Sequence, residues 1–223
     1  SGEIYTTDVA IHGHTIVGLG SYKGKHEIDV TGKYVCPGFI DGHVHIESSM
    51  VPIPEYARAV VPLGTTTVIM DCHEIANVLG VPGITLMLAS SKLAPLGVFA
   101  VLPSSVPASP FETPGAVLNA YDLHLLLEKR RILGMGEMMN YPGVINADPG
   151  VLDKMKMVEI QRLVVDGHAP GLGGKDLNAY VAAGVHSDHE SLTAAEAREK
   201  LRAGMWLMVR EASNAHNLRD LLP

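Results

Sequence analysis

The chain has 223 residues and a formal net charge of −7, and 47% of its residues are hydrophobic. These values argue against a disordered polymer and a basic nucleic-acid-binding domain, and they indicate one large or two modest globular domains with a substantial core. Two cysteines are too few for a disulfide framework and indicate a cytoplasmic protein, and no apolar run is long enough to span a membrane.

Residues 1–36 have the pattern of a small β-domain. Strands are expected at 8–11 and 15–19, because apolar residues there flank His12-Gly13-His14, which is typical of a hairpin turn. Further strand-like segments cover 27–30 and 34–35. We interpret this region as part of an N-terminal β-sandwich, and His12 and His14 as turn residues.

From residue 37 onward, the pattern alternates between strands and helices. The expected strands after the first one lie at 65–70, 98–102, 132–137, 163–167, 184–187 and 205–210, and the expected helices lie at 55–61, 84–93, 121–129, 151–160, 177–183 and 194–203. Thr193 and Glu196 form a capping-box pattern at the start of the last helix, and Glu196 can pair with Lys200. Parallel strands that alternate with helices predict an α/β sheet or barrel.

The first of these strands leads into two histidines. Residues 34–40 are largely apolar, and His43 and His45 follow in Asp41-Gly42-His43-Val44-His45. Residues i and i+2 of an extended strand project from the same face, so both imidazoles can reach one metal ion. Such a pair alone is more often incidental, and the downstream residues decide in favour of a site.

Three further side chains follow later strands. Glu137 lies in an otherwise apolar strand, where a carboxylate is costly unless it is paired or bound to a metal. His168 and His189 follow the next two strands, although His189 lies in a polar segment where a surface histidine would be ordinary. Active-site residues of a parallel barrel lie at the carboxyl ends of its strands, which is where all of these residues are expected.

Several segments together resemble one family. They are 37–50, 71–78, 136–140, 166–170 and 187–190. As a set they are similar to the adenine deaminase family of the amidohydrolase superfamily, whose members are metal-dependent hydrolases with a (β/α)8 TIM-like barrel beside a small β-domain. Residues 37–223 supply about seven βα units, whereas a whole barrel takes about 250 residues. We therefore expect an incomplete barrel, truncated at both ends, that lacks the eighth strand and its essential aspartate.

The resemblance implies a role for each site residue. His43 and His45 would bind one metal, His168 and His189 a second, and Glu137 would bridge the two. Manganese or iron is expected, with zinc as a further possibility. The implied catalytic residues are Glu137, His189 and His73, and the implied substrate-binding residues are Glu47, Ser48, His73 and Arg210. Asp188 or Glu190 is expected to orient a ligand histidine.

The implied reaction is the hydrolysis of adenine, a purine, to hypoxanthine and ammonia, with this chain as part of the active enzyme and inactive alone. One alternative is another amidohydrolase with two metals that acts on a cyclic amide or amidine. A second is a non-catalytic fragment. No nucleic-acid or membrane partner is expected, whereas the open strand edges of a partial barrel would favour a homo-oligomer or association with the missing part of the barrel.

Overall fold

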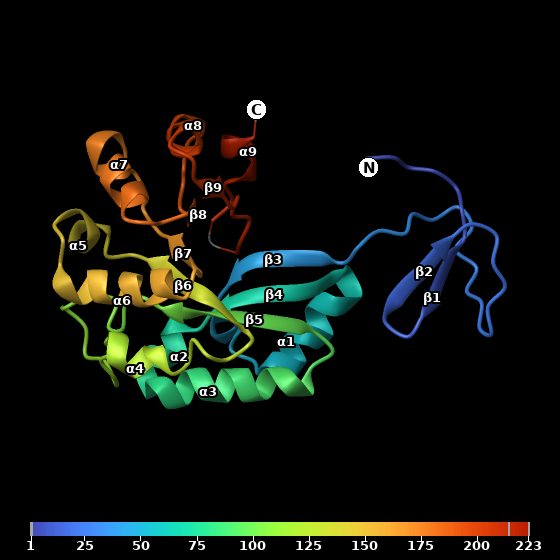
Figure 1. Ribbon diagram of the computed structural model, residues 1–223, viewed down its shortest axis with the longest axis horizontal. Helices are drawn as coiled ribbons and strands as arrows, with labels where there is room; N and C mark the ends of the chain where they lie inside the picture. The colour runs from blue at the N-terminus through green and yellow to red at the C-terminus, as the bar shows by residue number, and fades with distance from the viewer. Residues whose placement is uncertain (1, 214, 223) are drawn as a thin grey trace. The chain divides into compact units, whose positions relative to one another are not determined.

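Five parallel strands form the main sheet in the computed structural model, which describes residues 2–213 and 215–222. They pair in chain order: β3 (Phe39–Val44), β4 (Thr65–Asp71), β5 (Gly97–Pro103), β6 (Ile132–Met138) and β7 (Val164–Gly167). β8 (Ser187–Asp188) and β9 (Trp206–Leu207) form a second parallel pair beyond β7 (Figure 1). The amide of His186 donates to the carbonyl of Val165 over 3.0 Å, which joins the start of β8 to β7. The prediction of an incomplete α/β barrel is therefore confirmed.

Helices follow the strands in each of the seven strand–helix units. They are α1 (Ile53–Val60), α2 (His73–Leu79), α3 (Val81–Ser90), α4 (Ala120–His124), α5 (Tyr141–Ile145), α6 (Pro149–Ile160), α7 (Gly174–Ala182), α8 (Ala194–Arg202) and α9 (Leu218–Leu221). Short 3-10 helices lie at η1 (Ile46–Ser49), η2 (Val61–Leu63) and η3 (Ser91–Leu93). The sequence pattern did not predict α2, α5 and α9, because segments of four to seven residues are too short for a helical period.

The core lies between the sheet and its helices. β5 is buried along nearly its whole length, as is usual for a central parallel strand covered on both faces. Met70, Leu102 and Met135 from three neighbouring strands and Leu123 from α4 are fully buried in the same cluster. In Figure 1, α1, α2 and α3 lie along one side of β3, β4 and β5.

One end of the sheet is open. β3 pairs with β4 and with no other strand among the described residues. Phe39 and Ile40 on this edge strand are 64% and 68% exposed. Unpaired backbone groups beside exposed apolar side chains make such an edge suited to pairing with further polypeptide.

The segment before β3 holds one hairpin. The chain forms two compact units, Ser1–Pro37 and Gly38–Pro223. In the first unit, β1 (Val9–His12) and β2 (Thr15–Leu19) pair in antiparallel fashion, as predicted. The strands expected at 27–30 and 34–35 are absent from the described residues, so that part of the prediction was wrong. Their apolar side chains find no partner strand, and Ile28 and Tyr34 are 87% and 84% exposed. The first barrel strand likewise begins at Phe39 and not at Tyr34.

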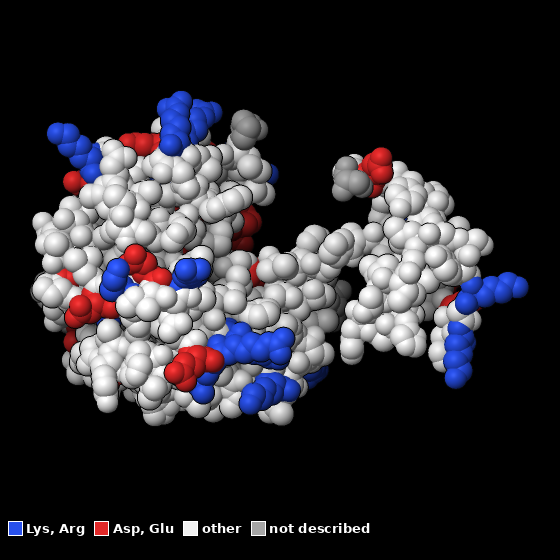
Figure 2. Space-filling model, viewed as in Figure 1, with Lys and Arg blue, Asp and Glu red and all other residues white. Residues whose placement is uncertain are grey.

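Charged side chains of both signs lie on the face shown in Figure 2. On this face, Lys and Arg are interspersed with Asp and Glu, and uncharged side chains cover most of the rest. In the part of the chain that the structure describes, none of the helices is both long enough and apolar enough to cross a membrane.

Candidate metal centre

The carboxyl ends of the strands bring five histidines and one glutamate together. His43 and His45 lie at the end of β3, and His73 begins α2 directly after β4. Glu137 lies near the end of β6, while His168 and His189 follow β7 and β8. Because parallel strands end at the same rim of a sheet, residues up to 146 positions apart in sequence meet here. The structure thus assembles all five residues that the sequence predicted as metal ligands, with His73 beside them.

Glu137 occupies the centre of this cluster, with different histidines at its two oxygens. Oε1 lies 2.6 Å from Nε2 of His45 and 3.2 Å from Nε2 of His43. Oε2 lies 2.6 Å from Nδ1 of His168 and 3.7 Å from Nε2 of His189. The carboxylate therefore faces the β3 histidines with one oxygen and the β7 and β8 histidines with the other.

The nitrogens of the first pair also converge. Nε2 of His43 and Nε2 of His45 are 3.2 Å apart, and both face the same oxygen of Glu137. The i, i+2 relation at the end of β3 thus brings the two rings together on one side of the strand. His43 also stacks on His189, with ring centroids 3.8 Å apart, so the cluster is continuous across the rim.

Burial and pairing act in opposite directions on the protonation of this cluster. Burial alone raises the pKa of Glu137, but hydrogen bonds from the surrounding histidines hold it far below the ordinary value. Burial alone lowers the pKa of His43 and of His45, yet hydrogen bonds to Glu137, together with Asp166 for His43, raise each to about 9. In the same way the pKa of His189 rises to about 10. For each of these groups the contacts within the cluster therefore outweigh the effect of burial.

Asp166 is a site residue that the sequence analysis missed. Its Oδ2 accepts from Nδ1 of His43 at 3.0 Å and lies 3.6 Å from Nδ1 of His189. Its other oxygen accepts from the hydroxyl of Ser187 at 2.5 Å. The signal was present as the Asp-Gly-His order at the end of a predicted strand, in which the aspartate precedes the histidine by two residues. A carboxylate on the far nitrogen of a histidine fixes which nitrogen can bind a metal.

Asp71, the last residue of β4, lies next to two other histidines of the cluster, His73 and His45. Its Oδ1 lies 3.4 Å from Nδ1 of His73, and its backbone carbonyl accepts from Nδ1 of His45 at 2.9 Å. Gly136 makes room for this fully buried carboxylate, since a Cβ there would lie 2.0 Å from Oδ2 of Asp71. The glycine before Glu137 thus allows β4 and β6 to place two carboxylates close together.

The expected role of Asp188 was wrong. Asp188 accepts hydrogen bonds from the amide of Ala169 at 2.9 Å, from Ser191 at 2.8 Å and from the buried ammonium of Lys200 at 2.9 Å. These partners use its oxygens, so it anchors the segments that carry His168 and His189 and does not contact either ring. Glu190 lies 3.8 Å from Nε2 of His189, and Asp166 is the closer orienting group.

Lys200 extends this anchor into α8. Its ammonium donates to Glu196 at 2.7 Å, as the predicted i, i+4 pairing requires, and to the carbonyl of Ala169 at 2.7 Å. Thr193 accepts from the amide of Glu196 and caps the helix, as predicted. The carboxylate of Glu196 accepts from the amides of Gly171 and Leu192, so the reciprocal half of the capping box does not form. The reason is that Lys200 and the backbone after β7 hold this carboxylate.

The donor set fits a metal ion. Three groups of His, Asp and Glu side chains in the described residues have ligand atoms within 4.8 Å of one another: His43, Glu137 and His189; His45, His73 and Glu137; and His168, His189 and Glu190. Nδ1 of His73 and Nδ1 of His189 are buried without a hydrogen-bond partner, which is costly for polar atoms unless another partner is bound. Imidazole nitrogens and carboxylate oxygens suit divalent transition metals. The cluster could therefore hold a divalent metal ion.

The residues expected to bind substrate lie around this centre at different depths. Oε1 of Glu47 lies 3.4 Å from the amide of Ile75, while Oε2 is buried without a partner, and burial raises the pKa of this carboxyl. Ser48 is exposed and donates to Glu74 at 2.5 Å.

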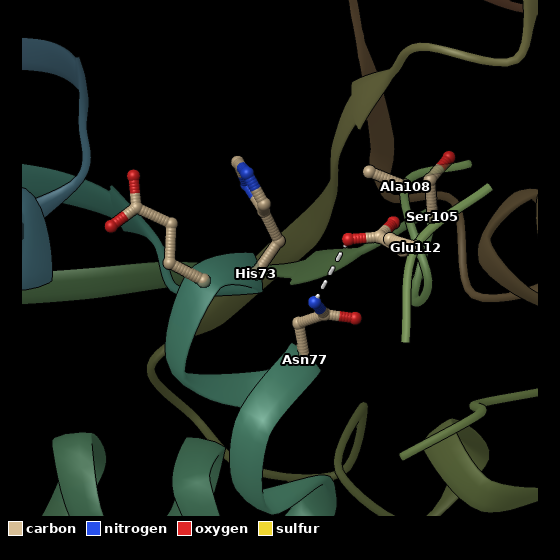
Figure 3. A pocket seen from close by; sticks show the side chains of 6 residues that line it. His73, Asn77, Ser105, Ala108 and Glu112 are labelled. Carbon is tan, nitrogen blue, oxygen red and sulfur yellow. Dashed lines mark hydrogen bonds between the residues drawn. The ribbon is translucent and has the colours of Figure 1, made fainter. Parts of the chain in front are cut away.

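The other two expected residues, Arg210 and His73, contact different members of the cluster or their neighbours. Arg210 follows β9 and forms an ion pair with Glu190, next to His189. His73 faces Glu137 at 3.7 Å and lines a cleft beside the cluster (Figure 3).

The sequence is similar to several known proteins. The profile of the Amidohydrolase family matches residues 34–221. A protein of Clostridium acetobutylicum described as "Adenine deaminase" is 55% identical over 222 residues, which is 100% of this chain and 39% of that protein. "Adenine deaminase 2" of Carboxydothermus hydrogenoformans is 54% identical over 223 residues, again covering 100% of this chain and 39% of that protein. The chain therefore spans about 39% of the length of these relatives.

An archaeal relative and a solved structure extend the comparison. The "Adenine deaminase" of Archaeoglobus fulgidus is 51% identical over 216 residues, which cover 97% of this chain and 38% of that protein. A crystal structure described as that of an uncharacterized protein superposes with a TM-score of 0.50 and 16% identity, over 92% of this chain and 61% of that chain. At this identity the structural likeness concerns the fold alone.

Proposed function

This chain belongs to the amidohydrolase family, and we propose that it supplies the metal-binding part of an active site that hydrolyses adenine to hypoxanthine and ammonia. One observation carries the proposal: a buried carboxylate, Glu137, meets five imidazoles at the strand ends of a sequence 55% identical to a protein described as an adenine deaminase. The chain covers about 39% of that relative, so the activity is proposed for a polypeptide of the relatives' length.

We assign the ligands from the two faces of Glu137. His43 and His45, which share Oε1, would hold one divalent ion, and His168 and His189, near Oε2, would hold a second. Manganese or iron is proposed, with zinc as the alternative, because nitrogen and oxygen ligands accept all three. When bound, such ions lower the pKa of water and supply a nucleophile at neutral pH.

Other side chains of this chain would orient the ligand histidines and exchange protons with the substrate. Asp166 holds the ring of His43 through a hydrogen bond to Nδ1, which leaves Nε2 of that ring facing Glu137, and Asp166 lies 3.6 Å from Nδ1 of His189. His73 lies between Asp71 and Glu137 and lines the cleft, so its ring can exchange a proton with a base bound there. Glu137, His189 and His73 are accordingly the proposed catalytic residues, and Glu47, Ser48 and Arg210 form the proposed rim around the substrate.

The remaining proposals concern partners and location. The open edge of β3, with exposed Phe39 and Ile40, supports association either with further strands of the same polypeptide or with a second copy. Interspersed charges on the face in Figure 2 are unlike the basic patch of a nucleic-acid-binding protein. Cys36 and Cys72 are both free thiols, which supports a reducing compartment such as the cytoplasm. A role in purine metabolism follows from the proposed substrate, adenine.

The test is ammonia release from adenine by a polypeptide of the relatives' length that carries this sequence, loaded with manganese or iron. We expect release in the unmodified protein and its loss in His43→Ala and Glu137→Ala variants. A folded, metal-loaded protein that releases no ammonia from adenine would overturn the proposed substrate. The search would then move to other cyclic amidines and amides.

A further inference from the structure

A cleft of about 240 Å³ opens beside the metal centre on the side of His73. Its lining consists of His73, Glu74, Asn77, Ser105, Ala108 and Glu112 (Figure 3). The volume lies just below the usual range for small-molecule sites, so the cleft suits a ligand of one or two rings.

The part of the cleft lined by Asn77 and Glu112 is rich in hydrogen-bond acceptors. Oδ1 of Asn77 is buried and has no hydrogen-bond donor, while Nδ2 of the same amide donates to Oε2 of Glu112 over 3.1 Å (Figure 3). Oε1 of Glu112 accepts from the amide of Ser109 at 2.7 Å. A buried carbonyl oxygen without a donor is unfavourable, and a ligand N–H would satisfy it.

Helix α2 sets the direction in which the cleft extends from the metal centre. His73 and Asn77 are four residues apart on α2, so they lie on one face of the helix, about one turn or 5.4 Å apart along its axis. His73 is the residue nearest the cluster, with Nδ1 3.7 Å from Oε1 of Glu137. A flat two-ring base with its reacting carbon at the cluster would therefore present its opposite edge to Asn77.

Resting on the proposed function, we propose that Asn77 is a specificity-determining residue that reads the N9–H/N3 edge of a free purine base. Oδ1 accepts the N9–H, and the second N–H of the amide, which Glu112 does not use, can donate to N3. This edge lies opposite the 6-amino group that the reaction removes. A nucleoside lacks the N9–H and carries a sugar there, so the same contact rejects it.

The experiment compares two ligands that are not consumed, hypoxanthine and 9-methylhypoxanthine. Their dissociation constants are measured by calorimetry with a metal-loaded polypeptide of the relatives' length. We expect hypoxanthine to bind the unmodified protein about tenfold or more tightly than its methylated form, the size expected for leaving a buried acceptor unpaired. Asn77→Ala and the nearly isosteric Asn77→Leu should bring this ratio close to one. Asn146→Ala, which changes an exposed asparagine on another helix end, should keep it.

The ratio is taken within each variant, so a partly unfolded sample does not change its meaning. A ratio near one in the unmodified protein, or an unchanged ratio in both Asn77 variants, overturns the inference. The proposed function is tested separately by ammonia release. If the Asn77-dependent ratio is found while adenine yields no ammonia, the base-recognition site stands and the proposed reaction fails.

Discussion

Oδ2 of Asp166 lies 3.0 Å from Nδ1 of His43, although 123 residues separate the two in sequence. The contact turns the imidazole so that Nε2 faces Glu137, 3.2 Å away. A histidine held by a carboxylate on one nitrogen offers the other one, in a fixed direction, to a metal. Asp166 also lies 3.6 Å from Nδ1 of His189, so one carboxylate is close to histidines from both proposed ligand pairs.

Replacing Asp166 with asparagine should weaken metal binding without removing a ligand. We expect Asp166→Asn to lower metal affinity about 10- to 100-fold, because the amide no longer holds the ring of His43 through a charged acceptor. The measurement is metal content after dialysis against graded chelator. Asp153→Asn, an exposed change on α6, is the control and should match the unmodified protein. Equal metal content in the two variants would show that Asp166 does not orient the ligands.

Glu137 should be indispensable for metal retention. Glu137→Gln removes the charge that faces both histidine pairs, and we expect metal content to fall close to zero after gel filtration. A bound ion stabilises the native state by mass action, so chelation should lower the Tm of the unmodified protein. The same chelation should leave the Tm of Glu137→Gln unchanged, because that variant holds no ion to lose. Glu159→Gln, on an exposed part of α6, should respond like the unmodified protein.

The hydroxyl of Tyr180 links the end of β6 to the residue that follows β7. It donates to the carbonyl of Met138 at 2.7 Å and accepts from the amide of His168 at 3.1 Å, and the side chain is fully buried. Tyr180→Phe leaves both backbone groups unpaired, and we expect a loss of about 1–3 kcal/mol in the free energy of unfolding. Tyr121→Phe, at a residue 81% exposed, is the matched control. Denaturant unfolding checks both variants, and equal midpoints would contradict the structural role of this hydroxyl.

Sequence reasoning predicted most of the fold because the parallel strands carry a strong local signal. β4, β5 and β6 are short apolar runs between helical segments, and their expected bounds differ from the observed ones by one residue at most. The segment at 205–210 was harder, since only Trp206 and Leu207 pair with β8. A strand with one short partner depends on tertiary contacts that a local pattern does not contain.

The site was predictable where a residue type was costly in its local setting. A carboxylate in the apolar strand β6 marked Glu137 as a candidate, and the i, i+2 histidines marked His43 and His45 once the downstream residues were taken with them. Asp166 and Asp71 were not singled out, because an aspartate at a strand end is ordinary in sequence. Their roles arise from contacts with histidines on other strands, which only the folded chain brings within reach.

The buried ammonium of Lys200 should be essential for stability. It is 0% exposed and lies 2.9 Å from Oδ2 of Asp188, which is also 0% exposed. Lys200→Met leaves a buried carboxylate without its partner, and such changes cost about 3–5 kcal/mol. The control is Lys156→Met, which breaks the exposed Lys156–Glu159 pair at 2.8 Å and should cost about 0–1 kcal/mol. Free energies of unfolding from denaturant titrations at pH 7 give both numbers.

The pH dependence of this difference gives a sharper test. Burial tends to raise the pKa of Asp188, but the hydrogen bond and the charge of Lys200, together with hydrogen bonds from Ala169 and Ser191, outweigh it and hold the pKa below the ordinary value of 3.8. A carboxyl with a depressed folded-state pKa contributes stability above its unfolded pKa and loses it as pH falls through the folded one. Without Lys200, burial should raise the pKa of Asp188, so the variant avoids the buried charge by protonation. The stability gap between the unmodified protein and Lys200→Met should therefore narrow as pH falls from 7 towards 4. A gap that stays constant over this range would show that the charge of Asp188 does not set the cost.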